Sequence, residues 1–382
     1  MICRNVPFPN PRIMQETRWA QPSKKTKERC TIMNVNNLRP KEAYNLAIVG
    51  ATGAVGETFL NILEQREFPI NTLKLYASKR STGKQVTFKG TTYTIEELTE
   101  DSFKDIDIAL FSAGGAQSKE YAPIAVKAGA VVVDNSSAFR LDPDVPLVVP
   151  EVNPEDVAWH NGIISNPNCT TIIMLVALKP LYDYSRVKQV FVSTYQSASG
   201  AGAQAMEELK QQVKDWSAGN DLSVDKFAHQ LLYNVIPHID TFQDNGYTGE
   251  EMKMFNETRK ILRDEEISVS ATCVRIPVLY SHSEAVTVTT EEPISPEKAR
   301  ELFEDAPGLT VTDNPEGCEY PMPLVSQFQD DCYVGRIRKN IAAENTLNFW
   351  ISGDQIRKGA ALNAIQIAEL LINSAQRNRQ AA

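Results

Sequence analysis

Hydrophobic and polar positions along residues 45–65 follow two periods in succession. The apolar stretch 45–49 has the length of a buried strand, and a glycine-rich turn follows it. Apolar side chains then recur at i, i+4, i+7 and i+8, at Val55, Phe59, Ile62 and Leu63. This spacing predicts a helix with one buried face, so the segment is interpreted as a strand, a tight turn and a helix.

The alternation of predicted strands and helices continues as far as about residue 167. Further strands are predicted over residues 73–77, 106–111 and 130–134, with a helical stretch over 119–127. Strands that alternate with helices indicate a parallel sheet with crossover helices. The first half of the chain is therefore expected to be an α/β domain with a Rossmann-type, doubly wound parallel sheet.

Beyond residue 167 the pattern changes to shorter alternations. The stretches 187–195, 269–276 and 285–290 alternate apolar and polar residues, as half-exposed antiparallel strands do. They predict a second, α+β domain with a mixed or antiparallel sheet. The segment 358–373 is an amphipathic helix, with apolar side chains at Ala361, Ile365, Ala368, Leu371 and Ile372, and we expect it to return and cover the first sheet.

The 382 residues are too many for one ordinary core, which favours two domains. We expect a dinucleotide-binding domain at 45–167 with 355–382, and a catalytic domain at 168–354. Residues 1–44 hold nine Lys and Arg against three Asp and Glu, and are predicted to be a poorly ordered extension. An upstream start codon, with Met33 as the true start, is the simpler explanation of this segment, and a basic transit peptide is the alternative.

Composition narrows the possible functions. A net charge of −9, with one short basic cluster at 24–27, argues against a nucleic-acid partner. The longest apolar run, 172–178, is far shorter than the roughly 20 residues of a membrane helix. Six scattered cysteines without a C-x-x-C pair indicate a reducing compartment, and no metal-ligand spacing is present.

The glycine-rich turn is a candidate phosphate site. Glycines stand at Gly50, Gly53 and Gly56, between the first strand and the first helix, where backbone N–H groups can hold a pyrophosphate. A merely tight turn is the alternative, because G-x-x-G-x-x-G departs from the commoner G-x-G-x-x-G.

The end of the second strand bears on the choice of dinucleotide. Where an NAD-binding chain has a carboxylate for the ribose, this one has Ser78, Lys79, Arg80 and Ser81. A guanidinium pairs with a 2′-phosphate, so NADP is favoured over a solvated basic turn without a ligand.

Cys169 is the candidate nucleophile. It lies in Ser-Asn-Pro-Asn-Cys-Thr-Thr, between a short apolar strand and an apolar helix, so it is predicted to open that helix. The positive end of a helix dipole lowers a thiol pKa toward neutrality, and we expect this for Cys169. A buried structural cysteine is the alternative. Among four histidines, His282 follows the strand that carries Arg275 and is the candidate general acid and base.

An anion site is suggested by three polar residues, Arg140, Asn168 and Lys253. Glu250 and Lys253 are spaced i, i+3 and share a helix face. They could instead form an ordinary surface ion pair, the commoner outcome for such a spacing.

Eight strings in one order resemble aspartate-semialdehyde dehydrogenase of the bacterial and plant type, from about residue 45 to the C-terminus. They occupy residues 50–56, 77–81, 111–115, 134–140, 165–171, 193–202, 273–277 and 282–284. The resemblance implies reversible, NADPH-dependent reduction of L-4-aspartyl phosphate to L-aspartate 4-semialdehyde and phosphate. This reaction is a step toward lysine, threonine, methionine and isoleucine.

The resemblance also implies roles for individual residues. Cys169 matches the thioester-forming nucleophile, His282 the acid and base, and Gln196 the residue that orients the acyl group and contacts substrate. Arg275 matches the grip on the substrate carboxylate, and Glu250 lies near the amino group. The phosphate positions correspond to Arg140, Asn168 and Lys253. The NADP contacts correspond to Gly50, Thr52, Gly53, Ala54, Val55, Gly56, Ser78, Arg80, Ser81, Ser199, Gly200 and Gln355.

The family is commonly a homodimer formed through the second domain, and a cytoplasmic location is expected, or a plastid if residues 1–44 are a transit peptide. Three alternatives stay open. The first is another acyl-phosphate reductase, such as the N-acetyl-γ-glutamyl-phosphate enzyme. The second is a short-chain dehydrogenase, suggested by Tyr184-x-x-x-Lys188, which chance and a strand start disfavour. The third is a non-catalytic NADP-binding sensor.

Overall fold

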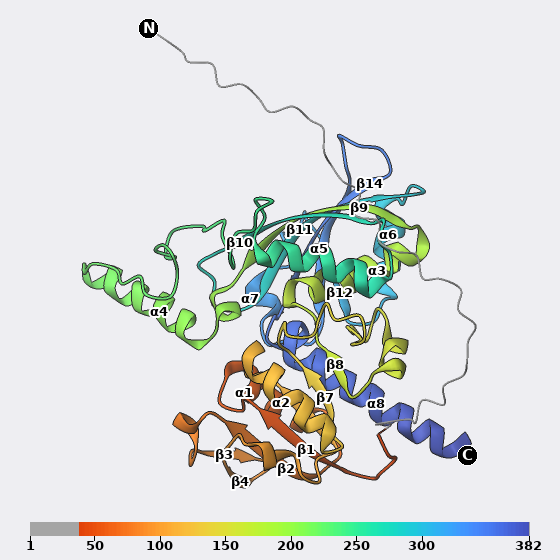
Figure 1. Cartoon of the computed structure of the whole chain (residues 1–382). Coiled ribbons are helices and arrows are strands. Elements are labelled where there is room, and N and C mark those ends of the chain that lie inside the picture. Colours follow the sequence, from red (N-terminus) through yellow and green to blue (C-terminus); the bar gives the residue numbers. More distant parts are fainter. Residues whose placement is uncertain (1–37, 382) are drawn as a thin grey trace, which may run out of the picture. The chain divides into compact units, whose positions relative to one another are not determined.

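The computed structural model describes residues 38–381, and within them two six-stranded sheets (Figure 1). The expectations for the basic cluster 24–27, for Met33 and for most of the extension 1–44 lie outside these residues. None of the described helices is both long and apolar enough to cross a membrane.

The first sheet is parallel throughout, with the order β5-β2-β1-β6-β7-β8. Its strands are β1 (Tyr44–Val49), β2 (Ile70–Ala77), β5 (Glu96–Glu97), β6 (Ile108–Phe111), β7 (Val131–Asp134) and β8 (Ile163–Ser165). Helix α1 (Ala54–Gln65) follows β1, and α2 (Gly115–Lys127) follows β6. The predicted Rossmann-type sheet and its crossover helices are confirmed.

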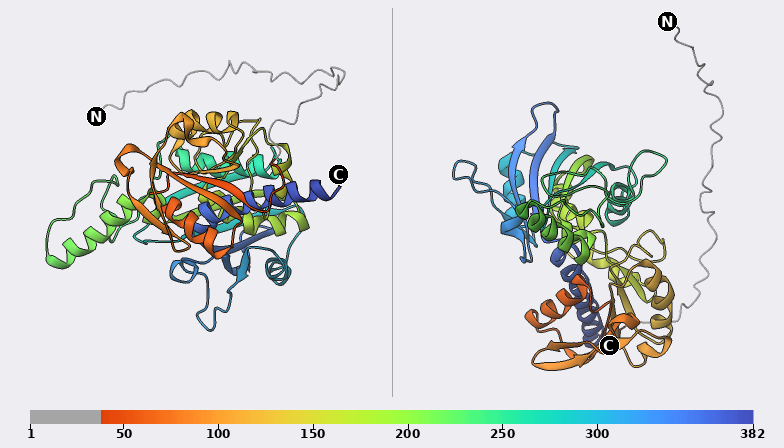
Figure 2. Two further views of the ribbon diagram at one scale, coloured as in Figure 1. Left: turned by 90° about the horizontal axis from the view of Figure 1, so that it is seen from below. Right: turned by 90° about the vertical axis from the view of Figure 1, so that its left-hand side faces the viewer.

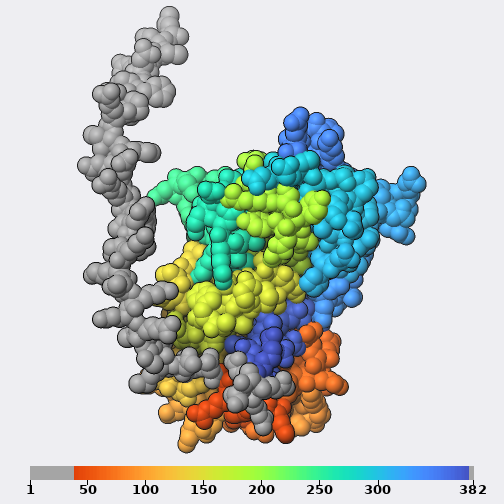
Figure 3. Space-filling model, turned by 90° about the vertical axis from the view of Figure 1, so that its right-hand side faces the viewer, coloured from red at the N-terminus to blue at the C-terminus, as the bar shows by residue number. Residues whose placement is uncertain are grey.

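Apolar cores cover both faces of this sheet. One core joins alternate residues of β1, such as Leu46 and Ile48, to α1 and to the C-terminal helix α8 (Leu362–Ala381). The other joins the intervening residues Ala47 and Val49 to α2. The five apolar positions predicted for the returning helix all lie in the first core, which confirms that expectation. In Figure 3 the blue C-terminal helix is flanked by red and orange residues of this lobe.

Smaller elements complete the first lobe. Strands β3 (Gln85–Phe88) and β4 (Thr91–Thr94) form a hairpin whose two turn residues, Lys89 and Gly90, have φ of 47° and 74°. Two positive φ values are typical of the tight turns that join hairpin strands. Short 3-10 helices occur at η1 (Lys79–Ser81), η2 (Glu100–Phe103) and η3 (Pro154–Trp159).

The second sheet is mixed, with the order β10-β9-β11-β14-β13-β12. Its strands are β9 (Val187–Gln196), β10 (Ser268–Arg275), β11 (His282–Thr290), β12 (Leu309–Val311), β13 (Cys332–Lys339) and β14 (Thr346–Gly353). The predicted mixed sheet is confirmed: β11 runs antiparallel to β9 and β14, while β9 and β10 run parallel. A crossover of some 70 residues, which holds two helices, connects them and allows this direction.

Helices cover one face of the second sheet and leave the other less buried. The covered face packs against α3 (Cys169–Tyr184), α5 (Gly249–Leu262) and α6 (Pro296–Glu304) in a single apolar core. The opposite face carries Phe191, which is 50% exposed, and a Tyr195–Trp350 ring pair. The alternation predicted from the sequence therefore has one buried side and one open side.

Helix α4 (Ala203–Ala218) projects away from the second sheet (Figures 1 and 2). Gly202 precedes it with φ 93°, and Gly219 ends it in the left-handed region. The other short elements of this lobe are η4 (Ala198–Ala201), α7 (Pro323–Ser326) and a π-helical turn, η5 (Arg357–Ala361), which leads into α8.

Candidate active site

The glycine-rich turn is built around close backbone contacts. A side chain on Gly50, which has φ 91°, would put Cβ 2.3 Å from the carbonyl oxygen of Ser112 at the end of the neighbouring strand. A Cβ on Gly56 would stand 2.3 Å from the carbonyl oxygen of Gly50. These two glycines are therefore required for the turn to close, whereas Gly53 has its nearest neighbour at 3.5 Å.

A cavity of about 480 Å³ opens at the carboxyl ends of β1, β2 and β6. This is where parallel sheets bind dinucleotides. Five predicted cofactor residues line it, namely Gly50, Thr52, Gly53, Ser78 and Arg80. Ser81 lies behind this wall, 3.3 Å from the Thr52 hydroxyl, while Ala54 and Gly56 line neither this cavity nor the next.

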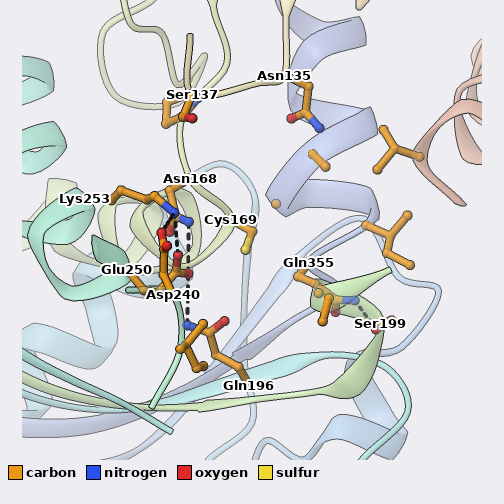
Figure 4. Close-up of a pocket in the computed structure, with 18 of the residues that line it drawn as sticks. Asn135, Ser137, Asn168, Cys169, Gln196, Ser199, Asp240, Glu250, Lys253 and Gln355 are labelled. Atoms are coloured by element: carbon orange, nitrogen blue, oxygen red, sulfur yellow. Dashed lines mark hydrogen bonds and ion pairs between the residues drawn. The ribbon is translucent and has the colours of Figure 1, made fainter. Parts of the chain in front are cut away.

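Cys169 lies in a second cavity, of about 450 Å³. The predicted residues that it brings together come from both lobes: Val55, Arg140, Asn168, Cys169, Gln196, Ser199, Gly200, Glu250, Lys253, Arg275 and Gln355. In Figure 4 the Cys169 sulfur is seen between a polar group around Glu250 and the Gln355–Ser199 pair. Val55 belongs to the glycine-rich segment 50–56, whose Gly50, Thr52 and Gly53 line the first cavity, so this segment borders both cavities.

Cys169 is the first residue of α3, as predicted, and the residue before it explains why. Asn168 is the N-cap, and its Oδ1 accepts hydrogen bonds from the N–H groups of Thr170 at 3.1 Å and Thr171 at 3.3 Å. A capping asparagine thus starts the helix at the cysteine. The Asn168 side chain is fixed at the same time, because its Nδ2 donates to Glu250.

The expected lowering of the Cys169 pKa is wrong for this structure. Burial raises the pKa of the thiol to about 12, and the negative charge of Glu250 adds to the increase. Arg140 and Arg275 act in the opposite direction and do not offset burial. Cys169 is partly accessible from the cavity, and in the ligand-free protein the helix N-terminus does not offset the packing around the sulfur.

A buried ionic cluster forms one wall of the cavity. The Glu250 carboxylate accepts from Asn168 Nδ2 at 3.0 Å, Gln196 Nε2 at 3.1 Å and Lys253 Nζ at 3.0 Å. Lys253 Nζ also donates to Asp240 Oδ2 at 2.8 Å. Burial favours the neutral form of Glu250, yet its partners lower its pKa. With a 5% exposed glutamate, the surface ion pair is the wrong interpretation.

Arg275, Gln196 and His282 sit at one edge of the second sheet. Arg275 pairs with Gln196 across the parallel strands β10 and β9, and His282 begins the adjoining strand β11. The Arg275 guanidinium donates to the carbonyl oxygen of Ser197 at 2.5 Å. A side chain on Gly200 would reach 2.9 Å from the His282 ring and 3.1 Å from Arg275, so this glycine admits both.

His282 lies behind Gly200 and is not among the residues that line the cavity. Its Nδ1 accepts a hydrogen bond from the N–H of Ser197 at 3.1 Å. The neutral ring therefore carries its proton on Nε2, which has no hydrogen-bond partner among the described residues. Burial and the Arg275 charge lower the pKa of His282 well below its ordinary value.

Arg140 is buried, and three of its guanidinium N–H groups donate hydrogen bonds to other residues of the protein. Nε donates to the carbonyl oxygen of Asn166, one terminal nitrogen to that of Asn135, and the other to Glu257 at 3.1 Å. Glu257 also accepts from the N–H of Asn168 at 2.7 Å. Two of the five N–H groups of Arg140 are left for a ligand.

The comparisons with known proteins agree with this geometry. Residues 45–160 match the model of the semialdehyde dehydrogenase NAD binding domain, and 178–358 match the semialdehyde dehydrogenase dimerisation domain. The chain is 60% identical over 333 residues to aspartate-semialdehyde dehydrogenase of Aquifex aeolicus, covering 86% of this chain and 98% of that protein. This chain belongs to the aspartate-semialdehyde dehydrogenase family.

Solved structures of the aspartate-semialdehyde dehydrogenase family have the same fold. The crystal structure of aspartate semialdehyde dehydrogenase II from Vibrio cholerae, also solved in complex with ASA, has a TM-score of 0.85 and 48% identity. It covers 87% of this chain and 99% of its own. The enzyme from Candida albicans, solved with NADP, has a TM-score of 0.69 and 25% identity, covering 86% and 98%. The family consists of oxidoreductases of amino-acid biosynthesis that use a nicotinamide dinucleotide.

The short-chain dehydrogenase alternative fails on the fold as well as on the family. Tyr184 is the last residue of α3 and Lys188 stands on β9, so the two do not share a helix. The silent-sensor alternative fails on family membership. Among residues 38–381, no three His, Cys, Asp or Glu side chains are placed to hold a metal ion.

Sequence reasoning missed the carboxylates that hold the predicted cations. Asp240 pairs with Lys253, and Glu257 with Arg140. Both are separated from the motifs in sequence, although Glu257 lies one helical turn beyond Lys253 and two beyond Glu250. That i, i+4 spacing was a usable signal for a shared helix face.

Proposed function

We propose that this chain reduces L-4-aspartyl phosphate to L-aspartate 4-semialdehyde with NADPH, through a thioester on Cys169. The observation that carries the proposal is Cys169 at the start of α3, inside a cavity whose walls also supply Arg275, Glu250 and Lys253. A small metabolite with a carboxylate, an amine and a phosphoryl group needs such a combination of charges.

The Cys169 sulfur attacks the acyl carbon, the carbon–oxygen bond to phosphate breaks, and a thioester forms. The cofactor supplies hydride to that carbonyl carbon when bound. The resulting tetrahedral oxyanion collapses, the carbon–sulfur bond breaks, and the aldehyde leaves. The positive end of the α3 dipole, where Cys169 lies, would stabilise the negative charge that builds on oxygen.

Because the pKa of the free thiol is high, the thiol has to lose its proton during the reaction. Arg140 lowers the pKa of the thiol, and substrate binding would change the charge around the sulfur further. His282 would act as the acid and base. In the tautomer described, Nε2 carries the proton and can donate it. Nε2 would accept the thiol proton after the ring proton has shifted to Nδ1, which breaks the hydrogen bond from the Ser197 N–H. Movement of the segment 197–201, which holds Gly200 in front of the ring, would bring the two groups together.

Substrate recognition is divided between two charges. Arg275 would hold the α-carboxylate with its guanidinium fork, and Glu250 would accept from the ammonium group. Gln196 is fixed by Glu250 at 3.1 Å and by Thr194 at 3.3 Å, so its amide is set to orient the acyl group. Phosphate would be held by Arg140, Asn168 and Lys253.

The dinucleotide would extend from Arg80 and Ser81 to the Cys169 cavity, along the glycine turn. Thr52, Gly53 and Val55 line the path, and Ser199, Gly200 and Gln355 face its nicotinamide end. The residues directly after β2 are Ser78, Lys79, Arg80 and Ser81, and none of them is a carboxylate that could bind the ribose of NAD. This supports NADP over NAD. Ala54 and Gly56 would act through the backbone of the turn.

The domain limits 45–167 with 355–382, and 168–354, remain our proposal, as does a homodimer. Its support is the match of 178–358 to a dimerisation domain, together with the open face of the second sheet around Phe191. A cytoplasmic location stays a prediction from the cysteine pattern. The plastid alternative falls on residues outside those described.

The test is a steady-state assay with aspartate semialdehyde, phosphate and NADP. We expect Cys169→Ala to abolish turnover and retain NADP binding, while Cys318→Ala, at an exposed free thiol, matches the unmodified enzyme. An active Cys169→Ala enzyme would overturn the proposal. N-acetylglutamate semialdehyde, assayed beside the natural aldehyde, tests the remaining rival, and its preferential use would favour that reductase.

A further inference from the structure

A third cavity, of about 280 Å³, lies against the first turns of α5. It shares four lining residues with the Cys169 cavity: Ser137, Arg140, Asp240 and Lys253. These residues therefore form the wall between the two spaces. Two of them, Arg140 and Lys253, are cations of the proposed phosphate site.

The remaining walls of this side cavity are uncharged apart from Glu257, and they open to solvent. Thr241, Gln243 and Asn256 offer hydroxyl and amide groups, and Gly249 and Met252 complete the lining. Thr241 and Gln243 are exposed, as is Leu141 at 56%. A hydrated ion can enter such a polar mouth without first passing the Cys169 cavity.

The shared wall is held by ion pairs that an anion can exchange. Lys253 Nζ is shared by Asp240 at 2.8 Å and Glu250 at 3.0 Å. Asp240 has φ of 69°, and its carboxylate packs on Gly249, where a Cβ would come within 2.8 Å. Asp240 is the more exposed of the two partners, at 36% against 7% for Glu250. The contact to Asp240 is thus the one that faces the side cavity and can be released to a competing anion.

We propose that this side cavity is a separate entrance for inorganic phosphate to the Arg140–Lys253 wall. The inference rests on the proposed function. In the oxidative direction a phosphate oxygen must attack the thioester carbonyl, so that the carbon–sulfur bond breaks, the Cys169 thiolate leaves, and acyl phosphate forms. The acyl group and the cofactor occupy the Cys169 cavity at that stage, and the side cavity reaches the same two cations from the opposite side.

The experiment narrows the entrance without touching the proposed site. Asn256→Phe fills the side cavity from α5, and Gln243→Trp fills its mouth from an exposed loop. For both we expect kcat/KM for phosphate to fall about tenfold, with kcat at saturating phosphate and KM for aldehyde and NADP within about twofold of the parent enzyme. Leu324→Trp, a bulky change at a 79% exposed position outside all three cavities, is the control and should leave every constant unchanged.

The outcomes separate this inference from the function on which it rests. An unmodified enzyme that shows no dependence on phosphate would refute the proposed function. A phosphate-dependent enzyme whose phosphate constants are unaltered in both variants would refute the side entrance alone. If Asn256→Phe disturbs all constants together, the Gln243→Trp result decides, because that residue lies on the surface. If Gln243→Trp changes the kinetic constants for phosphate, aldehyde and NADP by equal factors, the proposal of a separate phosphate entrance is also refuted.

Discussion

Replacing Gly359 with alanine tests how the cysteine is positioned. Gly359 lies in the π-helical turn η5, and a Cβ there would stand 2.9 Å from Cys169 Cβ and 3.3 Å from its Cα. Carbon atoms in contact are normally at least about 3.5 Å apart, so the nearer pair is about 0.6 Å too close. One of the two backbones has to move in the variant.

The structure indicates that the cysteine moves, because η5 is anchored. Lys358 is 1% exposed and its ammonium donates to Glu151 at 2.5 Å, Gln366 at 2.7 Å and Asn363 at 3.0 Å. A displacement of 1 Å at a reacting group can cost about a hundredfold in rate. For roughly half that displacement we expect kcat of Gly359→Ala to fall about tenfold or more.

The assay combines turnover with a direct probe of the sulfur. We expect kcat to fall while NADP binding, followed by cofactor fluorescence, changes little, and the rate of Cys169 alkylation by iodoacetamide should change with kcat. Gly115→Ala is the matched control, because no atom of residues 38–381 outside its own neighbourhood lies within 4 Å of the added Cβ and φ is not positive. A Gly359→Ala enzyme with parental kcat and alkylation rate would refute the reasoning. A parallel loss in Gly115→Ala would refute it as well.

Three further predictions follow from charge and burial. Because the pKa of Cys169 is raised to about 12, its alkylation in the ligand-free enzyme should rise with pH throughout pH 7–10, and a plateau near neutrality would contradict this. Glu284 is fully buried, neither of its oxygens has a hydrogen-bond partner among residues 38–381, and burial raises its pKa well above normal. The free energy of unfolding therefore falls as pH rises from the ordinary carboxyl range. Glu284→Gln should therefore melt a few degrees higher at pH 8 and no higher at about pH 4, and an unchanged difference between these pH values would refute the cause. Arg80→Ser should raise KM for NADP about tenfold or more and leave KM for NAD unaltered, and equal effects on both would remove Arg80 from the 2′-phosphate.

Local patterns were enough to predict the first sheet and the start of α3. The Gly50–Gly56 turn includes a close contact between residues six positions apart, and Asn168 and Cys169 are neighbours in the chain. Both features could therefore be predicted from a short stretch of sequence. The β3–β4 hairpin was missed, although a Lys89-Gly90 pair between two alternating stretches was available as a signal.

Features that depend on distant residues were not predictable in this way. The high pKa of Cys169 comes from burial and from Glu250, which is 81 positions away in the chain. The Asp240 contact to Lys253 depends on a loop with a positive φ, and the place of His282 behind Gly200 depends on a segment after β9. The resemblance proposed Arg140 and Lys253 as the cations of the phosphate site, whereas their carboxylate partners Glu257 and Asp240 are identified from the fold.

The direction of one strand pair explains why the residues converge. Because β9 and β10 are parallel, their last residues, Gln196 and Arg275, lie at the same edge of the sheet. Strand β11 is antiparallel to β9, so its first residue, His282, reaches that edge too, and β14 ends there at Gly353, two residues before Gln355. A β10 antiparallel to β9 would carry Arg275 to the far end of an eight-residue strand, about 25 Å away. The long crossover through α4 and α5 thus brings the candidate substrate-binding arginine to the cysteine, and it also supplies Glu250 and Lys253 on the way.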